Sequence, residues 1–118
     1  MGSSFKDLVV WQRAIELSTV IYRFTSSFPR TEQFGLVTQM RRAAVSIASN
    51  IAEGYGRSTK GEYLQFLGHA RGSNSELQTQ LVISNLLGFG ENSSKDSADR
   101  LTADVSRMLN ALMTRLRG

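Results

Sequence analysis

The stretch that decides the fold is QMRRAAVSIASNIAEGYGRS, which runs from Gln39 to Ser58. Its apolar residues recur at helical spacing on more than one face, and a narrow polar strip lies between them. A helix that is apolar on two faces is usually buried on two sides. The polar strip consists of Gln39, Arg42, Ser46, Asn50 and Glu53.

Hydrophobic periodicity outside this stretch predicts three more helices, so we expect an all-α protein. Phe28 and Pro29 should end the first helix, because the residue before a proline is pushed out of the α conformation. Short connections make consecutive helices antiparallel neighbours, which predicts an up-and-down four-helix bundle. The expected helices cover residues 6–28, 32–53, 59–87 and 95–117 of a single domain spanning 1–118.

Several residues carry expectations about helix ends and packing. Thr59 and Glu62 fit a capping box, and Ser93 or Ser94 could cap the last helix. The turn Gly54-Tyr55-Gly56 should close the second helix with a left-handed glycine. Glycines inside the third helix suggest a close approach of two backbones, and three aromatic rings are expected in the core. These residues are Gly68 and Gly72, and Trp11, Tyr22 and Tyr63.

Composition sets limits on the class of protein. Of the 118 residues, 41% are hydrophobic and 20% charged, as in an ordinary globular protein. Cysteine is absent, which excludes disulfides and thiolate metal sites and fits the cytoplasm. No apolar run is long enough to cross a membrane, and the N-terminal segment lacks the pattern of a secretory leader. We therefore expect a cytoplasmic protein without a membrane partner.

No catalytic, cofactor or metal site is expected. Paired carboxylates, a nucleophile with its base, or a cluster of metal ligands cannot be assembled from these residues at helical spacing. His69 is the only histidine, and position 73, one helical turn later, is a serine. His69 is therefore expected on the surface. The glycines of residues 53–57 lack the preceding strand and the spacing of a phosphate-binding loop.

Apolar surface is left over once one bundle core is complete. On the second helix, Val45, Ala48 and Ala52 lie beyond what that core requires. Excess apolar surface of this kind favours a homo-oligomer with closed symmetry.

Four sequence motifs resemble those of one family. They are FxxLxxW at 5–11, FPxxExFGLxxQxRRAAxSI at 28–47, NIAEG at 50–54 and SxxEL at 73–77. The chain resembles the four-helix bundle proteins encoded in intervening sequences of bacterial 23S ribosomal RNA genes. This resemblance implies a homopentamer shaped like a tapered barrel with a central passage, and it implies no enzyme activity.

The chain is also similar to the accessory proteins of diversity-generating retroelements. These proteins share the pentameric architecture and associate with a reverse transcriptase and nucleic acid. This similarity implies that the chain could bind nucleic acid and a protein partner, in addition to other copies of itself.

Basic residues are in excess, with 14 Lys and Arg against 10 Asp and Glu and a net charge of +4. The densest basic stretch contains Arg41, Arg42 and Arg57, with Lys60 just beyond the turn. We consider these four residues as candidates for binding nucleic acid, since symmetry would multiply their potential around an axis. The alternative is that they are ordinary solvated charges and surface ion pairs.

The polar strip also has two interpretations. In one it contacts nucleic acid, with Arg42 on a phosphate and Asn50 on a base edge. In the other, which we favour, it is a hydrogen-bond network between helices or subunits. That network would contain Gln39, Ser46, Asn50, Glu53 and Glu76.

Taken together, these patterns favour a non-enzymatic, oligomeric scaffold that binds RNA or DNA through arginine-rich surface. The alternative is a protein–protein interaction module with no nucleic-acid role, whose basic charge matches an acidic partner.

Overall fold

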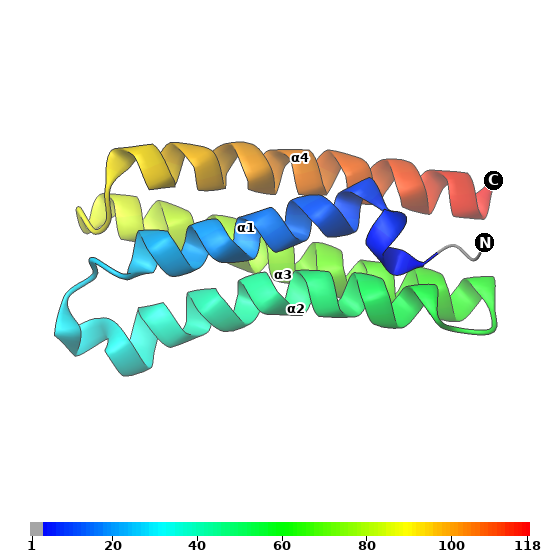
Figure 1. The fold of residues 1–118 in the computed structure, drawn as a ribbon, viewed down its shortest axis with the longest axis horizontal. Coiled ribbons are helices and arrows are strands. Elements are labelled where there is room, and N and C mark those ends of the chain that lie inside the picture. Colours follow the sequence, from blue (N-terminus) through cyan, green and yellow to red (C-terminus); the bar gives the residue numbers. More distant parts are fainter. Residues whose placement is uncertain (1–3) are drawn as a thin grey trace.

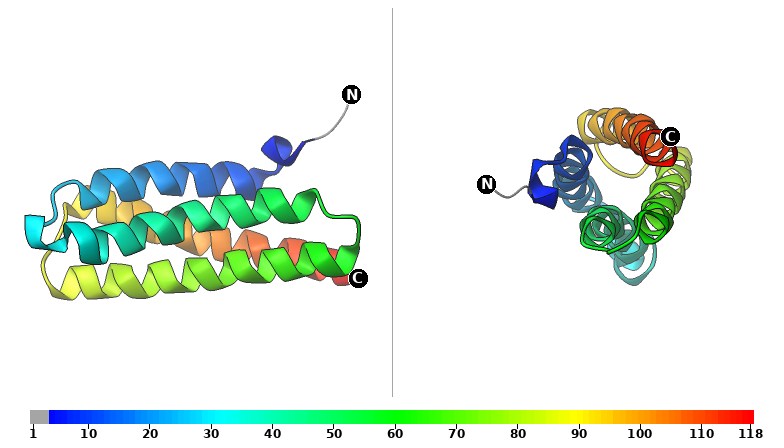
Figure 2. Two further views of the ribbon diagram at one scale, coloured as in Figure 1. Left: turned by 90° about the horizontal axis from the view of Figure 1, so that it is seen from below. Right: turned by 90° about the vertical axis from the view of Figure 1, so that its right-hand side faces the viewer.

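Four long helices run alternately up and down in the computed structural model, which describes residues 4–118 (Figure 1). Each helix packs against the next one in the chain, and the first packs against the last. Seen end-on, they stand at four corners in chain order (Figure 2). The all-α, up-and-down bundle expected from the sequence is confirmed. The helices are α1 Val9–Thr25, α2 Thr38–Tyr55, α3 Lys60–Leu86 and α4 Asn92–Arg117.

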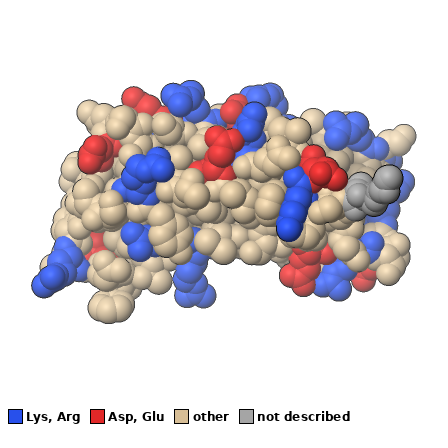
Figure 3. All heavy atoms as spheres, in the orientation of Figure 1, with Lys and Arg blue, Asp and Glu red and all other residues tan. Residues whose placement is uncertain are grey.

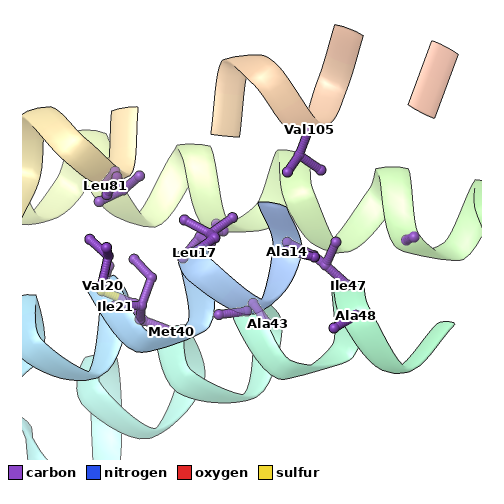
Figure 4. Packing of buried hydrophobic residues seen from close by; sticks show 14 of the residues in the cluster. Ala14, Leu17, Val20, Ile21, Met40, Ala43, Ile47, Ala48, Leu81 and Val105 are labelled. Atoms are coloured by element: carbon purple, nitrogen blue, oxygen red, sulfur yellow. The ribbon is translucent and has the colours of Figure 1, made fainter. Parts of the chain in front are cut away.

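The core forms where the apolar faces of the four helices meet (Figure 4). Met40, Ile47 and Ile51 of α2 are completely buried, as the apolar stripe of that helix predicts. Removing such side chains from water is the main favourable contribution to folding, at roughly 1.5–3 kcal/mol for each large one. The core therefore fixes which face of α2 points inward.

The first helix begins at Val9, not at residue 6 as expected. Ser4 and Asp7 cap each other across a short 3-10 turn, Phe5–Asp7, and Leu8 then takes an extended conformation. The break turns this segment away from the bundle (Figure 2). The helix also ends three residues early, at Thr25.

The second helix begins at Thr38, six residues later than expected. A 3-10 turn, Arg30–Glu32, and a wide turn, Gln33–Val37, precede it. Gly35 leaves the helical region there (φ −113°, ψ −108°). The Glu32 carboxylate accepts a hydrogen bond from the Leu36 amide at 3.4 Å, and this competes with continuous helix.

The structure contradicts the expectations about a left-handed glycine at the end of α2 and about a close approach at Gly68 and Gly72. Gly56 is not left-handed, since its φ is −84°. Gly54 is instead a packing residue, because a Cβ placed on it would lie 2.8 Å from the Cβ of Phe66 on α3. Gly68 and Gly72, expected at a close approach, have open space around them. The tight contact between α2 and α3 therefore lies at Gly54.

The helix ends around α3 and α4 differ in detail from expectation. Thr59 caps α3 as expected by accepting from the Glu62 amide at 3.1 Å, but the Glu62 carboxylate accepts from the Thr59 hydroxyl and not from its backbone. α3 ends at Leu86, one residue early. α4 begins at Asn92, three residues early, and neither serine caps it. Gly90 in the preceding loop is left-handed (φ +82°) and leaves room for the Phe24 ring.

Candidate interaction surfaces

A polar groove lies between α2 and α3 and unites part of the strip expected from the sequence. Its volume is about 300 Å³. The Ser46 and Ser73 hydroxyls meet across it at 3.0 Å, and the Asn50 amide donates to both the Ser46 carbonyl (2.8 Å) and its hydroxyl (3.0 Å). The serine pair joins α2 to α3, whereas the Asn50 bonds lie within α2. The groove is lined by Gln39, Arg42, Ala43, Ser46, Ser73 and Glu76.

Glu53 does not belong to this groove. It pairs with Arg57 at 2.9 Å, one helical turn further along the chain. Arg42 and Glu76 share the groove, but no ion pair joins them in the described part of the chain. The strip is thus divided into a Ser46–Ser73 link between helices, a charged groove and a separate surface ion pair.

The four candidate nucleic-acid residues do not form one patch. Arg41 and Arg42 lie near the start of α2, whereas Arg57 and Lys60 lie beyond its end. With a rise of 1.5 Å per residue, the two pairs are about 20 Å apart along the helix. Basic and acidic side chains are interspersed on the face shown in Figure 3.

Arg41 is held against α1. Its Nε donates to the Thr25 hydroxyl at 2.9 Å, a terminal nitrogen donates to the Tyr22 carbonyl at 3.3 Å, and the guanidinium lies 4.5 Å from the centroid of the Tyr22 ring. The expectation that Tyr22 lies in the core is wrong, because the residue is 46% exposed. Trp11 and Tyr63 are half-buried. The exposed Tyr22 ring therefore packs against the Arg41 guanidinium that links α2 to α1.

Arg57 and Lys60 belong to the end of the bundle where the α2–α3 turn meets the C-terminus of α4 (Figure 1). We call this region the turn end. Arg57 is ordered by Glu53 and by the Phe66 ring, whose centroid lies 4.6 Å from the guanidinium carbon. Tyr55 and Tyr63 meet edge to face at 6.1 Å. The turn end consists of Tyr55, Arg57, Lys60, Tyr63, Phe66, His69, Arg115 and Arg117.

Sequence reasoning missed Arg115 and Arg117, although a signal for them existed. In an up-and-down bundle the end of the last helix lies at the same end as the second connection. Arg115 affects Tyr63 directly. Burial raises the pKa of the Tyr63 phenol, the neighbouring Tyr55 raises it further, and the positive charge of Arg115 lowers it.

An apolar groove of about 290 Å³ runs between α1 and α2. Val45, Ala48 and Ala52, expected to exceed the needs of one core, line it. The expectation is wrong for Ala48, which is buried in the core, whereas Val45 is exposed. Ile15 and Val45 are 39% and 44% exposed, which is unusual for such side chains. The groove is lined by Trp11, Ile15, Ser18, Val45, Ala48, Ser49 and Ala52.

A second apolar surface, which we call the α3 patch, lies on the last turns of α3. Its most exposed members are Leu86 (79%) and Val82 (60%). α3 stands diagonally across the bundle from α1, so the α3 patch and the apolar groove lie on different helices (Figure 2). The patch consists of Val82, Ile83, Leu86 and Leu87.

The sequence matches one family of known proteins over most of its length. The family model described as 23S rRNA-intervening sequence protein matches residues 6–111. The chain belongs to that family. The match confirms the resemblance drawn from the motifs of residues 5–77 and extends it into α4.

A solved structure supports the fold of this 23S rRNA-intervening sequence protein. It is a protein of unknown function from the S23 ribosomal protein family of Bacteroides thetaiotaomicron, with a TM-score of 0.80 and 20% identity. The match covers 92% of this chain and 98% of the other. At this identity it shows a shared fold. No functionally curated protein matches the sequence.

Residues 4–118 show neither a metal-binding cluster nor a membrane-spanning helix. No group of three or more His, Asp or Glu side chains in that range is arranged to hold a metal ion. None of the helices described is both long and apolar enough to cross a membrane. The surfaces that stand out are therefore two grooves, an apolar patch and the turn end.

Proposed function

We propose that this protein is a homo-oligomeric scaffold of helical bundles that binds RNA or DNA through its arginine side chains. The role is one of binding without catalysis, in the cytoplasm. The observation that carries the proposal is the pair of exposed apolar surfaces on different helices of one bundle, the apolar groove and the α3 patch.

Self-assembly would cover both surfaces at once. If the α3 patch of one copy enters the apolar groove of the next, the contact is head-to-tail, and a head-to-tail contact closes into a ring when the rotation between copies allows it. Covering Leu86 and Val45 would remove apolar area from water at roughly 25 cal/mol per Å². The family resemblance suggests five copies for such a ring.

The nucleic-acid part rests on unpaired positive charge. Of the 14 Lys and Arg side chains, only Arg13, Arg57, Lys95 and Arg107 form ion pairs with described carboxylates. Of the other ten, Arg41 and Arg71 are held by hydrogen bonds to neighbouring helices, and the remaining eight are available to phosphate. A ring brings several copies of each onto one particle. Non-specific binding to nucleic acid is driven mainly by such contacts and by the counterions they release.

Assembly is tested by measuring the mass of the purified full chain by light scattering during gel filtration. We expect the wild type to elute as a multimer and Ile15→Asp to elute at a lower mass with unchanged helix content. The carboxylate would have to be buried in the groove without a partner. Ala103→Asp, on the exposed side of α4 outside both apolar surfaces, should leave the mass unchanged. A monomeric wild type would refute the scaffold.

Nucleic-acid binding is tested by the anisotropy of labelled RNA and DNA oligonucleotides across a salt series. We expect binding at about 50 mM salt that weakens steeply towards about 200 mM. If no oligonucleotide is retained at the lowest salt, the nucleic-acid role is wrong. An assembled protein would then act as a scaffold for a protein partner.

A further inference from the structure

The turn end gathers four basic side chains at one end of the bundle, and most of them are uncommitted. Lys60, Arg115 and Arg117 are exposed, and none forms an ion pair with a carboxylate of residues 4–118. Glu53 pairs with Arg57, whereas the Glu62 carboxylate accepts from the neutral Thr59 hydroxyl and keeps its negative charge. The four cations of the turn end outnumber these two carboxylates, so the region keeps a net positive charge.

Arg57 adds a guanidinium with defined contacts to these exposed charges. It is held between the Glu53 carboxylate and the Phe66 ring. Arg41, at the other end of α2, differs from the turn-end cations because its guanidinium is already occupied. Its guanidinium is occupied by Thr25 and by the backbone and ring of Tyr22, so it serves to join α1 to α2.

Aromatic rings lie among the cations of the turn end. Tyr55 and Tyr63 form one edge-to-face pair, and Phe66 forms another with the exposed His69, whose ring centroid lies 6.0 Å away. Burial and Tyr55 raise the pKa of Tyr63, and the Arg115 charge lowers it by a smaller amount. Cations beside aromatic faces are what single-stranded nucleic acid requires, because phosphates need charge and unpaired bases need a ring to stack on.

We infer that the turn end is a binding surface for single-stranded nucleic acid, with Lys60, Arg115 and Arg117 on the phosphates and the Tyr55 and His69 rings stacking on bases. This inference rests on the proposed nucleic-acid role and gives it a location. A duplex keeps its bases stacked internally and would meet only the cations. The surface should therefore prefer single strands to duplexes of the same sequence.

A ring would strengthen this preference. Copies related by rotation about one axis place their turn ends at the same height along that axis. One strand could then contact several turn ends, and each further contact would be intramolecular. A strand of roughly 20 nucleotides is long enough for more than one such contact, since compact single-strand sites cover about 4–16 nucleotides.

The charge part of the inference is tested with the full-length triple variant Lys60→Ala/Arg115→Ala/Arg117→Ala and labelled oligo(U) of roughly 20 nucleotides. We expect affinity at low salt to fall at least about tenfold, and the slope of log affinity against log salt to decrease by about 2. The matched control is Arg23→Ala/Arg30→Ala/Arg100→Ala, which removes three exposed cations that also lack a described ion pair. The control should change affinity less than about threefold.

The stacking part is tested with Tyr55→Leu, which keeps apolar bulk beside Tyr63, and separately with His69→Ala. We expect each to weaken oligo(U) binding about fivefold or more, because stacking of one base contributes roughly 1–3 kcal/mol. Binding to a duplex of equal length should not change. If both substitutions weaken duplex and single strand alike, the rings do not stack on bases.

The outcomes separate this inference from the broader proposal. If the wild type binds oligo(U) and the two triple variants lose affinity equally, the turn end is not the site, although nucleic-acid binding stands. If only Arg41→Ala/Arg42→Ala weakens binding, the site lies at the other end. If the wild type binds nothing, both ideas fail. Circular dichroism checks folding, and Lys60→Gln/Arg117→Gln repeats the test should the triple variant unfold.

Discussion

The guanidinium of Arg41 lies 4.5 Å from the centre of the Tyr22 ring and fastens the start of α2 to the end of α1. In the sequence, Arg41 and Arg42 are equivalent members of one basic stretch. In the structure Arg41 has two hydrogen bonds and a ring beneath it, while Arg42 lies exposed at the edge of the polar groove. Neighbouring arginines therefore have different roles.

Arg41→Ala should destabilise the protein by about 1–2 kcal/mol, because a hydrogen-bonded cation and its contact with the Tyr22 ring are lost. Arg42→Ala should change stability by less than about 0.5 kcal/mol, as expected for an exposed residue without a described partner. Urea denaturation followed by circular dichroism measures both. Equal effects of the two substitutions would contradict the structural role of Arg41.

Gly54→Ala should destabilise the bundle by about 1–3 kcal/mol, because the added methyl would press against Phe66 and force α2 and α3 apart. Gly68→Ala is the matched control within a helix. Nothing lies within 4 Å of its added methyl, so helix propensity should raise stability by up to about 1 kcal/mol. The same denaturation experiment compares them, and a stabilising Gly54→Ala would show that the helices are not tightly packed there.

Mixing two assembly variants should distinguish a head-to-tail contact from a symmetric one. Ile15→Asp spoils the apolar groove but keeps the α3 patch, whereas Leu86→Asp spoils the patch but keeps the groove. Each alone should be monomeric. Together they retain one intact patch and one intact groove, so equimolar mixing should give a particle of two chains that cannot grow into a ring.

The mass of this mixture is measured by light scattering, with Ile15→Asp mixed with Ala103→Asp as a comparison. A mixture of Ile15→Asp and Leu86→Asp that remains monomeric would rule out contact between the groove and the α3 patch.

Stability should decrease at alkaline pH in part through Tyr63. Burial raises the pKa of its phenol, so the folded state holds the proton more tightly than the unfolded chain. The stabilising contribution is therefore fully present below the ordinary tyrosine pKa, near 10, and is lost as pH rises through the higher pKa of the folded state.

Tyr63→Phe has no proton to lose at this position and should show a smaller decrease in the urea midpoint between about pH 9 and pH 11. An identical decrease in wild type and variant would indicate that Tyr63 does not contribute. Tyr22 and Tyr55 are present in both proteins and cancel in the comparison.

Much of the fold could be predicted from the sequence because helix formation and burial are local and periodic. The spacing of Met40, Ile47 and Ile51 marks the inward face of α2, and Thr59 marks the start of α3. Helix ends were less predictable. Gly35, Ser4 and Glu91 set boundaries through backbone conformation and hydrogen bonds that no periodicity reveals.

The candidate surfaces depended on contacts between residues distant in the chain. Ser46 bonds to Ser73 and Arg41 packs on the Tyr22 ring only after the helices have packed. The same holds for the effect of Arg115 on Tyr63. By itself the sequence determined the all-α class, the bundle order and the inward face of α2, because these follow from side-chain periodicity along one helix. Only the tertiary structure decided which arginines are bound and which are free, and where an apolar groove stays uncovered. Those properties depend on distances between helices, and packing alone sets such distances.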